Sequence, residues 1–229
     1  MSEPRLFLPV DEAYDRWSLF YDAYDNPLVF AASQVMERMA ERVVGLDVFE
    51  FGCGTGRNLA LLKRAGAARL AGCDFSAGML ARARKANPDL ALLQHDITLP
   101  LPLDLGSTDL ALFCLTLEHI GNLEPALRDA ARLVRRGGSI VIVEIHPFLA
   151  LLDVAAHFYD GATLVEMPTF PHSFSEYLTA AADAGLRVSE CREWRPRDLR
   201  QPVPTKLLKR GPDIPILVEL TLCPEWRER

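Results

Sequence analysis

Long apolar runs, paired cysteines and an excess of positive charge are all missing from this sequence of 229 residues. No run reaches the roughly 18 apolar residues that a membrane-spanning helix needs. The richest stretch, residues 140–158, is interrupted by Glu144, His146 and Asp153. The first residues, MSEPRLFLPVDEAYD, lack the basic-then-apolar order of a signal peptide. We therefore expect a soluble, cytoplasmic protein with no membrane partner.

The cysteines and the charge balance exclude two further classes. The five cysteines are scattered and never form a CxxC pair, so we predict neither a disulfide framework nor a bound metal. The formal net charge is -6, from 25 Lys and Arg against 31 Asp and Glu. Because nucleic-acid binding depends on a basic face that neutralises phosphates, this balance predicts no nucleic-acid partner.

Short apolar runs alternate with amphipathic helical patterns along most of the chain. We predict strands at Asp47–Phe51, Arg69–Cys73, Leu90–Leu93, Thr108–Leu115, Ser139–Ile145, Arg187–Glu193 and Ile216–Leu222. We predict helices at Asn58–Ala65, Ala77–Ala86, Pro125–Arg135 and, opened by a capping box of Ser173 and Glu176, up to Gly185. This alternation predicts an α/β fold with a doubly wound, mostly parallel sheet of seven strands. The proline-rich stretch before the last strand leaves no crossover helix, so that strand should be antiparallel.

Two segments lie outside this alternation. Residues 1–45 contain Tyr-Asp three times and a helix that Asn26 and Pro27 should cap. We predict that they form an N-terminal helical lid, although their aromatic side chains are also consistent with ordinary helix packing. Residues 46–229 then form the main domain, which carries an insertion at 146–172 rich in apolar and aromatic residues.

A glycine-rich loop follows the first predicted strand of the main domain, in Phe49-Glu50-Phe51-Gly52-Cys53-Gly54-Thr55-Gly56. Glycines let a chain turn sharply and let a ligand approach the backbone. The spacing is GxGxG with an acid two residues earlier. It is not the dinucleotide pattern GxGxxG, because Arg57 occupies the third glycine position, and it lacks the lysine of a phosphate-binding loop.

Acids also follow the next two predicted strands. Asp74 ends the second strand, and its two carboxylate oxygens can accept hydrogen bonds from both hydroxyls of a ribose. Asp96 ends the third, where it can accept from an adenine amino group. Because the carboxyl ends of parallel strands meet in one crevice, these acids and the glycine loop suit a cationic nucleoside better than a nucleotide phosphate.

From about Leu46 to His146 the sequence resembles the class I S-adenosylmethionine-dependent methyltransferases, in particular those with small-molecule acceptors. The glycine loop, Asp74, Asp96 and the run Leu117–Ile120 occur in the family's order. The resemblance implies that S-adenosylmethionine is the cofactor. It also implies cofactor contacts for the glycine loop (Glu50, Gly52, Gly54, Gly56), the ribose site (Asp74), the adenine site (Phe75, Met79, Asp96, Ile97) and the sulfonium site (Leu115).

The same resemblance implies transfer of a methyl group to an O or N atom of a small organic acceptor, with a role in secondary metabolism as one possibility. The insertion would shape the acceptor site, and Tyr14, Tyr21 and His172 are our candidates for acceptor binding. Two alternatives stay open, namely methylation of a macromolecule such as tRNA or protein, and a non-catalytic partner that only binds the nucleoside. We expect a monomer or a homodimer.

Proton removal from the acceptor is the one step that would need a catalytic base. His119 and His146 follow the fourth and fifth predicted strands, so they are our candidates, although either could be a packing or capping histidine. Glu118 and Glu144 could compete with them.

The segment from Arg192 to Arg210 carries seven Lys and Arg against two acids. It is either an anchor for a carboxylate or phosphate on the acceptor or a solvated loop.

Overall fold

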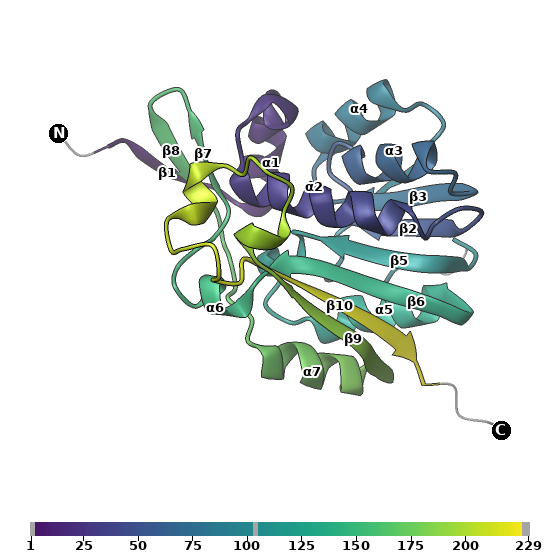
Figure 1. Cartoon of the computed structure of the whole chain (residues 1–229). Coiled ribbons are helices and arrows are strands. Elements are labelled where there is room, and N and C mark those ends of the chain that lie inside the picture. Colours follow the sequence, from purple (N-terminus) through teal and green to yellow (C-terminus); the bar gives the residue numbers. More distant parts are fainter. Residues whose placement is uncertain (1–2, 103–104, 226–229) are drawn as a thin grey trace.

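The computed structural model describes residues 3–102 and 105–225 and contains a seven-stranded sheet (Figure 1). Its strands are β2 (Asp47–Phe51), β3 (Arg69–Asp74), β4 (Ala91–Gln94), β5 (Thr108–Cys114), β6 (Val134–Ile145), β9 (Leu186–Trp194) and β10 (Leu217–Pro224). Their order is β4-β3-β2-β5-β6-β10-β9. All pairs are parallel except those of β10, which runs antiparallel to β6 and to β9. The predicted fold class and the antiparallel last strand are confirmed.

Helices cover both faces of this sheet. One face carries α2 (Pro27–Ala40), α3 (Arg57–Arg64) and α4 (Ala77–Ala86), and the other carries α5 (Glu124–Leu133) and α7 (Phe174–Asp183). The predicted caps are present: Asn26 accepts from two backbone N–H groups of the first turn of α2, and Ser173 with Glu176 forms the capping box of α7. Strand order reverses between β2 and β5, so their carboxyl ends open a crevice where such folds bind ligands.

The central strands are buried because helices shield them from both sides. Phe51 and Phe113 stack at 4.6 Å between ring centroids in the layer beneath α5 and α7. Each buried aromatic side chain of this kind contributes about 1.5–3 kcal/mol by leaving water. The predicted end of α5 at Arg135 was wrong, because Val134 already has extended backbone (ψ 129°) and pairs with Thr108 as the start of β6.

A second, smaller sheet lies beside the main one, and the sequence analysis did not predict it. It consists of β1 (Arg5–Phe7), β8 (Thr163–Glu166) and β7 (His157–Asp160). Strand β1 pairs with β8 in parallel, and β8 pairs with β7 as an antiparallel hairpin. The N-terminal segment therefore contains a strand as well as α1 (Val10–Trp17) and α2, and it is hydrogen-bonded to the insertion, which also contains α6 (Pro147–Ala150). Figure 1 shows this sheet and α1 at the end of the main sheet where its parallel strands finish.

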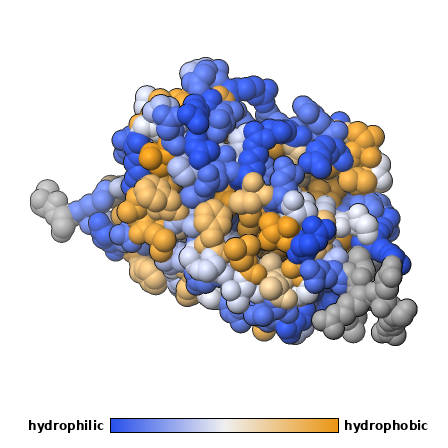
Figure 2. All heavy atoms as spheres, turned by 60° about the horizontal axis from the view of Figure 1, so that its bottom comes forward, coloured by the Kyte–Doolittle hydropathy of each residue, from blue (hydrophilic) through white to orange (hydrophobic). Residues whose placement is uncertain are grey.

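The molecular surface is mixed in polarity. Figure 2 brings the α7 side forward and shows hydrophobic side chains gathered between polar ones. Exposed apolar residues of α6, its following turn and α7 include Phe148, Leu151, Leu152 and Leu178. No helix within the described residues is long and apolar enough to cross a membrane.

Candidate active site

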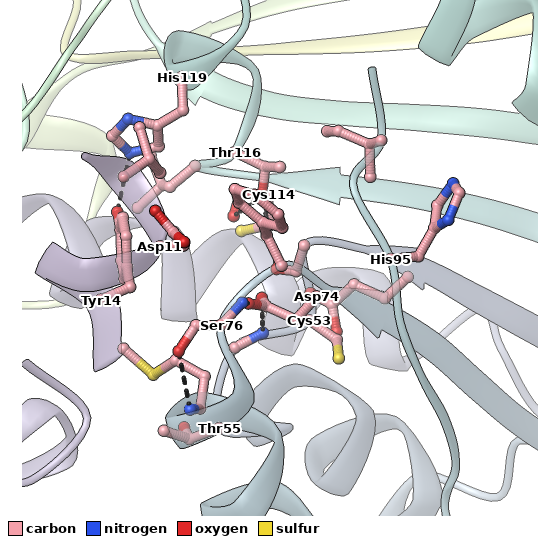
Figure 3. Close-up of a pocket in the computed structure, with 18 of the residues that line it drawn as sticks. Asp11, Tyr14, Cys53, Thr55, Asp74, Ser76, His95, Cys114, Thr116 and His119 are labelled. Carbon is pink, nitrogen blue, oxygen red and sulfur yellow. Dashed lines mark hydrogen bonds between the residues drawn. The ribbon is translucent and has the colours of Figure 1, made fainter. Parts of the chain in front are cut away.

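A cavity lies at the carboxyl ends of β2, β3, β4 and β5, and α1 forms part of its wall (Figure 3). We call it the first cavity. Nine of the ten residues predicted to bind the cofactor line it, namely Glu50, Gly52, Gly54, Asp74, Phe75, Met79, Asp96, Ile97 and Leu115. The tenth, Gly56, precedes α3 with a φ of +74°, and a Cβ there would approach Ala83 and Leu90 to 3.2 Å. Gly56 therefore lets the start of α3 pack closely against α4 and Leu90 behind the loop.

The other two loop glycines have different reasons to be glycine. Gly52 has a φ of +68°, and a Cβ on it would lie 2.4 Å from the side chain of Thr116. Gly54 has a φ of +53°, but a Cβ on it would meet no atom within 4 Å. Gly54 thus presents bare backbone to the first cavity, and any side chain there would project into open space that a ligand can fill.

Two carboxylates at the strand tips face the first cavity with acceptor capacity to spare. Asp74 Oδ2 accepts from the backbone N–H of Gly54 at 2.7 Å, and Oδ1 accepts from that of Ser76 at 2.9 Å. Each oxygen keeps a second lone pair for a ligand, while burial raises the pKa of Asp74. Asp96 uses only Oδ1 in the described contacts, to cap a turn through Thr98.

Two ionisable side chains without complete partners lie near the glycine loop. Glu50 is buried, its Oε1 accepts from Asn58 at 2.7 Å, and its buried Oε2 has no partner among the described residues. Burial raises the pKa of Glu50 to about 8. The buried Nε of Arg57 also lacks a hydrogen-bond partner in the described part of the chain. Buried polar atoms are rarely left unpaired, so this end of the first cavity suits a ligand that carries both an amine and a carboxylate.

The acids of two Tyr-Asp pairs fasten the N-terminal segment to the ligand-binding loops. Asp15 Oδ1 accepts from Ser76 Oγ at 2.5 Å and from the Gly78 N–H at 2.8 Å, at the start of α4. Asp22 Oδ1 accepts from Thr55 Oγ1 at 2.7 Å, in the glycine loop. These contacts hold α1 and the residues after it across the first cavity.

The tyrosines of the same pairs separate the first cavity from a second one. Tyr14, Tyr21 and Leu115 line both cavities. Burial raises the pKa of Tyr21 to about 12 and that of Tyr14 well above its ordinary value, so both rings are neutral at physiological pH. Leu115 has a φ of +54° directly after β5, a conformation that costs energy in a non-glycine residue and that clusters at functional sites. The second cavity is also lined by Tyr24, Leu149, Val154, Ile214 and Ile216.

His119 lines the first cavity, but both of its ring nitrogens are engaged. Nδ1 lies 3.1 Å from the carbonyl oxygen of Pro168, which can only accept, so Nδ1 carries the proton. Nε2 therefore accepts from the hydroxyl of Tyr14 at 2.8 Å, a contact drawn in Figure 3. Burial lowers the pKa of His119 to about 4. His119 is thus neutral and fixes the position of the Tyr14 hydroxyl between the two cavities.

Glu118, which the sequence analysis named only as a competitor of the two histidines, lines the second cavity. Its Oε2 accepts from the backbone N–H of Ala156 at 3.1 Å, and burial raises its pKa to about 7. Its position next to His119 in the sequence was the available signal. Glu144, at the end of β6, instead holds the turn after β5, because its Oε1 accepts from the N–H groups of Thr116 and Leu117.

The structure does not bring His146 or His172 to either cavity. His146 is buried, its Nδ1 accepts from the N–H of Phe148 to cap α6, and its Nε2 lies 2.9 Å from Glu193 Oε1. His172 is buried with Nε2 2.8 Å from the carbonyl oxygen of Ile120. Both histidines therefore order loops behind the cavities. Across residues 3–102 and 105–225, no three His, Cys, Asp or Glu side chains are grouped to hold a metal ion.

Comparison with known proteins agrees with this geometry. Residues 49–142 match the family model described as a methyltransferase domain. A demethylmenaquinone methyltransferase of Tropheryma whipplei is 30% identical over 196 residues, which cover 81% of this chain and 78% of that protein. An S-adenosylmethionine-dependent methyltransferase of Mesorhizobium loti has a TM-score of 0.67 and 23% identity, covering 85% of this chain and 99% of its own. The DhpI–SAH complex has a TM-score of 0.67 and 20% identity, covering 94% and 95%.

Proposed function

Because this chain belongs to the class I S-adenosylmethionine-dependent methyltransferases, we propose that it methylates an oxygen or nitrogen atom of a small organic acceptor bound in the second cavity. The observation that carries this proposal is the wall of Tyr14, Tyr21 and Leu115, which both cavities share. A methyl group presented at this wall from the first cavity would meet an acceptor in the second.

The residues of the first cavity fit S-adenosylmethionine. The unpaired Oε2 of Glu50 and Nε of Arg57 match the ammonium and carboxylate of its methionine end. The free acceptor sites of Asp74 suit the ribose hydroxyls, and the half-exposed ring of Phe75 with Met79 suits the adenine. When bound, S-adenosylmethionine supplies an electrophilic methyl group on a sulfonium sulfur.

A small acceptor is favoured by the form and lining of the second cavity. The N-terminal segment and the insertion both contribute to its wall, through Tyr24 and Val154 for example, so the acceptor lies inside a fold of the chain rather than on an open face. Its apolar and aromatic side chains suit an organic molecule with an apolar body. The T. whipplei relative is named for demethylmenaquinone, which supports a small-molecule acceptor.

We assign proton removal to Glu118 and the positioning of the acceptor to Tyr14 and His119. An acceptor hydroxyl loses its proton as the new bond to carbon forms, and a protonated amine must lose one before its nitrogen can attack; a base works best when its pKa is near the working pH. Glu118 meets this condition with a pKa of about 7, whereas the pKa of His119 is about 4 and its Nε2 is occupied by Tyr14. The Tyr14 hydroxyl, held by His119, then orients the acceptor at the shared wall.

The test is a screen for methyl transfer. We would incubate the full chain with S-adenosylmethionine and fractionated metabolite extracts, and follow S-adenosylhomocysteine release together with a gain of about 14 Da, the mass of a CH2 unit, in a small molecule. Y14F would serve as the site variant. Y159F would serve as the matched control, because Tyr159 lines the same cavity but is exposed. Methylation of tRNA or protein without any small-molecule product would contradict the proposal, as would cofactor binding with no transfer to any fraction.

A further inference from the structure

The basic segment from Arg192 to Arg210 divides into residues with partners and residues without them. Arg192 stacks on the ring of Trp194 at 4.0 Å, and Arg195 pairs with Glu193. Further along, Arg197 pairs with Asp213, and Arg200 pairs with Glu37. These four arginines are therefore used to hold the segment against its surroundings.

The last three cations of the segment are different. Lys206, Lys209 and Arg210 form no ion pair or side-chain hydrogen bond with the residues that the structure describes. All three line the second cavity, and none of the four partnered arginines does. The unpartnered positive charge of the segment is thus concentrated at the cavity.

Packing fixes the place of these cations. They lie on and just after the 3-10 helix η4 (Thr205–Leu208), whose Leu207 is buried in the core cluster that includes residues of α2. Upstream, the backbone N–H of Arg200 donates to Gln34 of α2 at 2.7 Å. In Figure 1 this yellow-green part of the chain runs beside α1 and the β7–β8 hairpin. The cations therefore belong to an ordered rim.

The charges that face these cations do not cancel them. The cavity lining contains two acids, Asp25 and Glu118, and one histidine, His157, besides its tyrosines. Because burial raises the pKa of Glu118 to about 7, that group is only partly ionised at neutral pH. Three cations against Asp25 and a partly ionised Glu118 therefore leave an excess of positive charge in the lining of the second cavity.

We propose that the second cavity selects acceptors that carry an anionic group, a carboxylate or a phosphate, which Lys206, Lys209 and Arg210 bind at its rim. The apolar body of the acceptor lies along Leu149, Ile214 and the tyrosines, and its reacting atom reaches the wall shared with the first cavity. This inference rests on the proposed function, because it names the acceptor class of the same site.

Binding of small probes to the full chain, saturated with S-adenosylhomocysteine, tests the inference. Titration calorimetry or ligand-observed NMR would compare benzoate and phenyl phosphate with the neutral benzyl alcohol. We expect at least one anionic probe to bind at least about tenfold more tightly than benzyl alcohol, as one or two charge pairs in a solvated rim would provide. The anion found to bind more tightly identifies a carboxylate or a phosphate as the group recognised. The preference should shrink as ionic strength rises.

Charge-matched variants locate the effect. K206Q/K209Q/R210Q should lose the preference, whereas R42Q/R64Q/K85Q, which removes three exposed cations that line neither cavity, should keep it. Both variants should bind S-adenosylhomocysteine as the wild type does. Equal affinity for charged and neutral probes overturns the inference, as does failure of both anions to bind or an equal loss in the control variant. Failure of S-adenosylhomocysteine itself to bind would instead count against the proposed function.

Discussion

Replacing Glu118 with Gln changes the one group that the proposed mechanism uses as a base while keeping its shape. The amide oxygen of Gln can still accept from the Ala156 N–H, so the loop that Glu118 holds should keep its hydrogen bond. A positioned base contributes about 10²–10⁴-fold in rate. We therefore expect E118Q to lower kcat by that factor, which corresponds to about 3–5 kcal/mol of transition-state stabilisation.

The pH profile gives a sharper signature than the rate alone. A group with a pKa of about 7 is about one-tenth ionised at pH 6 and about nine-tenths ionised at pH 8. The ratio of wild-type to E118Q turnover should accordingly rise about tenfold between these pH values. Using the ratio removes any pH dependence that belongs to the acceptor, since both enzymes receive the same compound.

The titratable groups that interact with Glu118 ionise at higher pH than Glu118 itself. Glu144 of β6 interacts with it, but burial raises the pKa of Glu144 to about 8, so Glu144 is largely neutral where Glu118 titrates. Tyr14 of α1 and Tyr177 of α7 also interact with Glu118; burial, and to a lesser extent this interaction, raises their pKa values well above the ordinary value. Since these groups are present in both enzymes, the ratio of wild-type to E118Q turnover isolates the titration of Glu118 near pH 7.

Stopped assays of S-adenosylhomocysteine release from pH 5.5 to 9 would measure these profiles. H119F serves as the comparison, because its ring has no nitrogen to accept from the Tyr14 hydroxyl; it should raise KM while keeping the rise in turnover near pH 7. Full turnover in E118Q would refute the assignment, and loss of the pH 7 rise in H119F alone would favour His119 as the base.

Three further outcomes follow from the site. Asp74→Asn should weaken S-adenosylhomocysteine binding about 10–100-fold in calorimetry. The reason is that it removes the charge that strengthens hydrogen bonds to a ribose, each of which contributes about 1.5–3 kcal/mol. Unchanged affinity would mean that Asp74 serves only the loop. Gly54→Val should abolish that binding, whereas Gly45→Val, which meets the same positive φ and open space away from both cavities, should lose only stability. His146→Ala should keep turnover and lower the free energy of unfolding, measured in denaturant, by about 1–3 kcal/mol. The reason is that it removes the cap of α6 and the contact with Glu193. A drop in turnover without destabilisation would instead indicate that His146 acts in the active site.

The seven-stranded sheet was predictable because its signals are local and repeated. Each buried strand is a short apolar run, and each helix has its own start and stop, as with Asn26 before α2 and the Ser173–Glu176 box before α7. The first cavity was predictable for the same reason. In this fold the carboxyl ends of the parallel strands meet at one edge of the sheet, so the glycine loop, Asp74 and Asp96 could be placed from their order alone.

The second cavity depends on contacts between distant segments, which one-dimensional patterns do not contain. Strand β1 is three residues long and forms only because β8, more than 150 residues later, offers it an edge. The β7–β8 hairpin did have a local signal in Asp160-Gly161, a pair typical of tight hairpin turns. His119 and His146 both follow strands of the main sheet, and only the partners of their ring nitrogens distinguish a residue at the cavity from a helix cap.

Pairing of β1 with β8 joins the N-terminal segment to the insertion through backbone hydrogen bonds. The part of this segment that lies across the first cavity is thus held by two kinds of contact: the hydrogen bonds of Asp15 and Asp22 to the loops of that cavity, and the ladder between β1 and β8. If a ligand enters the first cavity from this side, the contacts of Asp15 and Asp22 have to open, while the β1–β8 ladder can persist. Such a movement would also displace Tyr14 and Tyr21, which line both cavities, so ligand exchange in the first cavity would be coupled to the shape of the second.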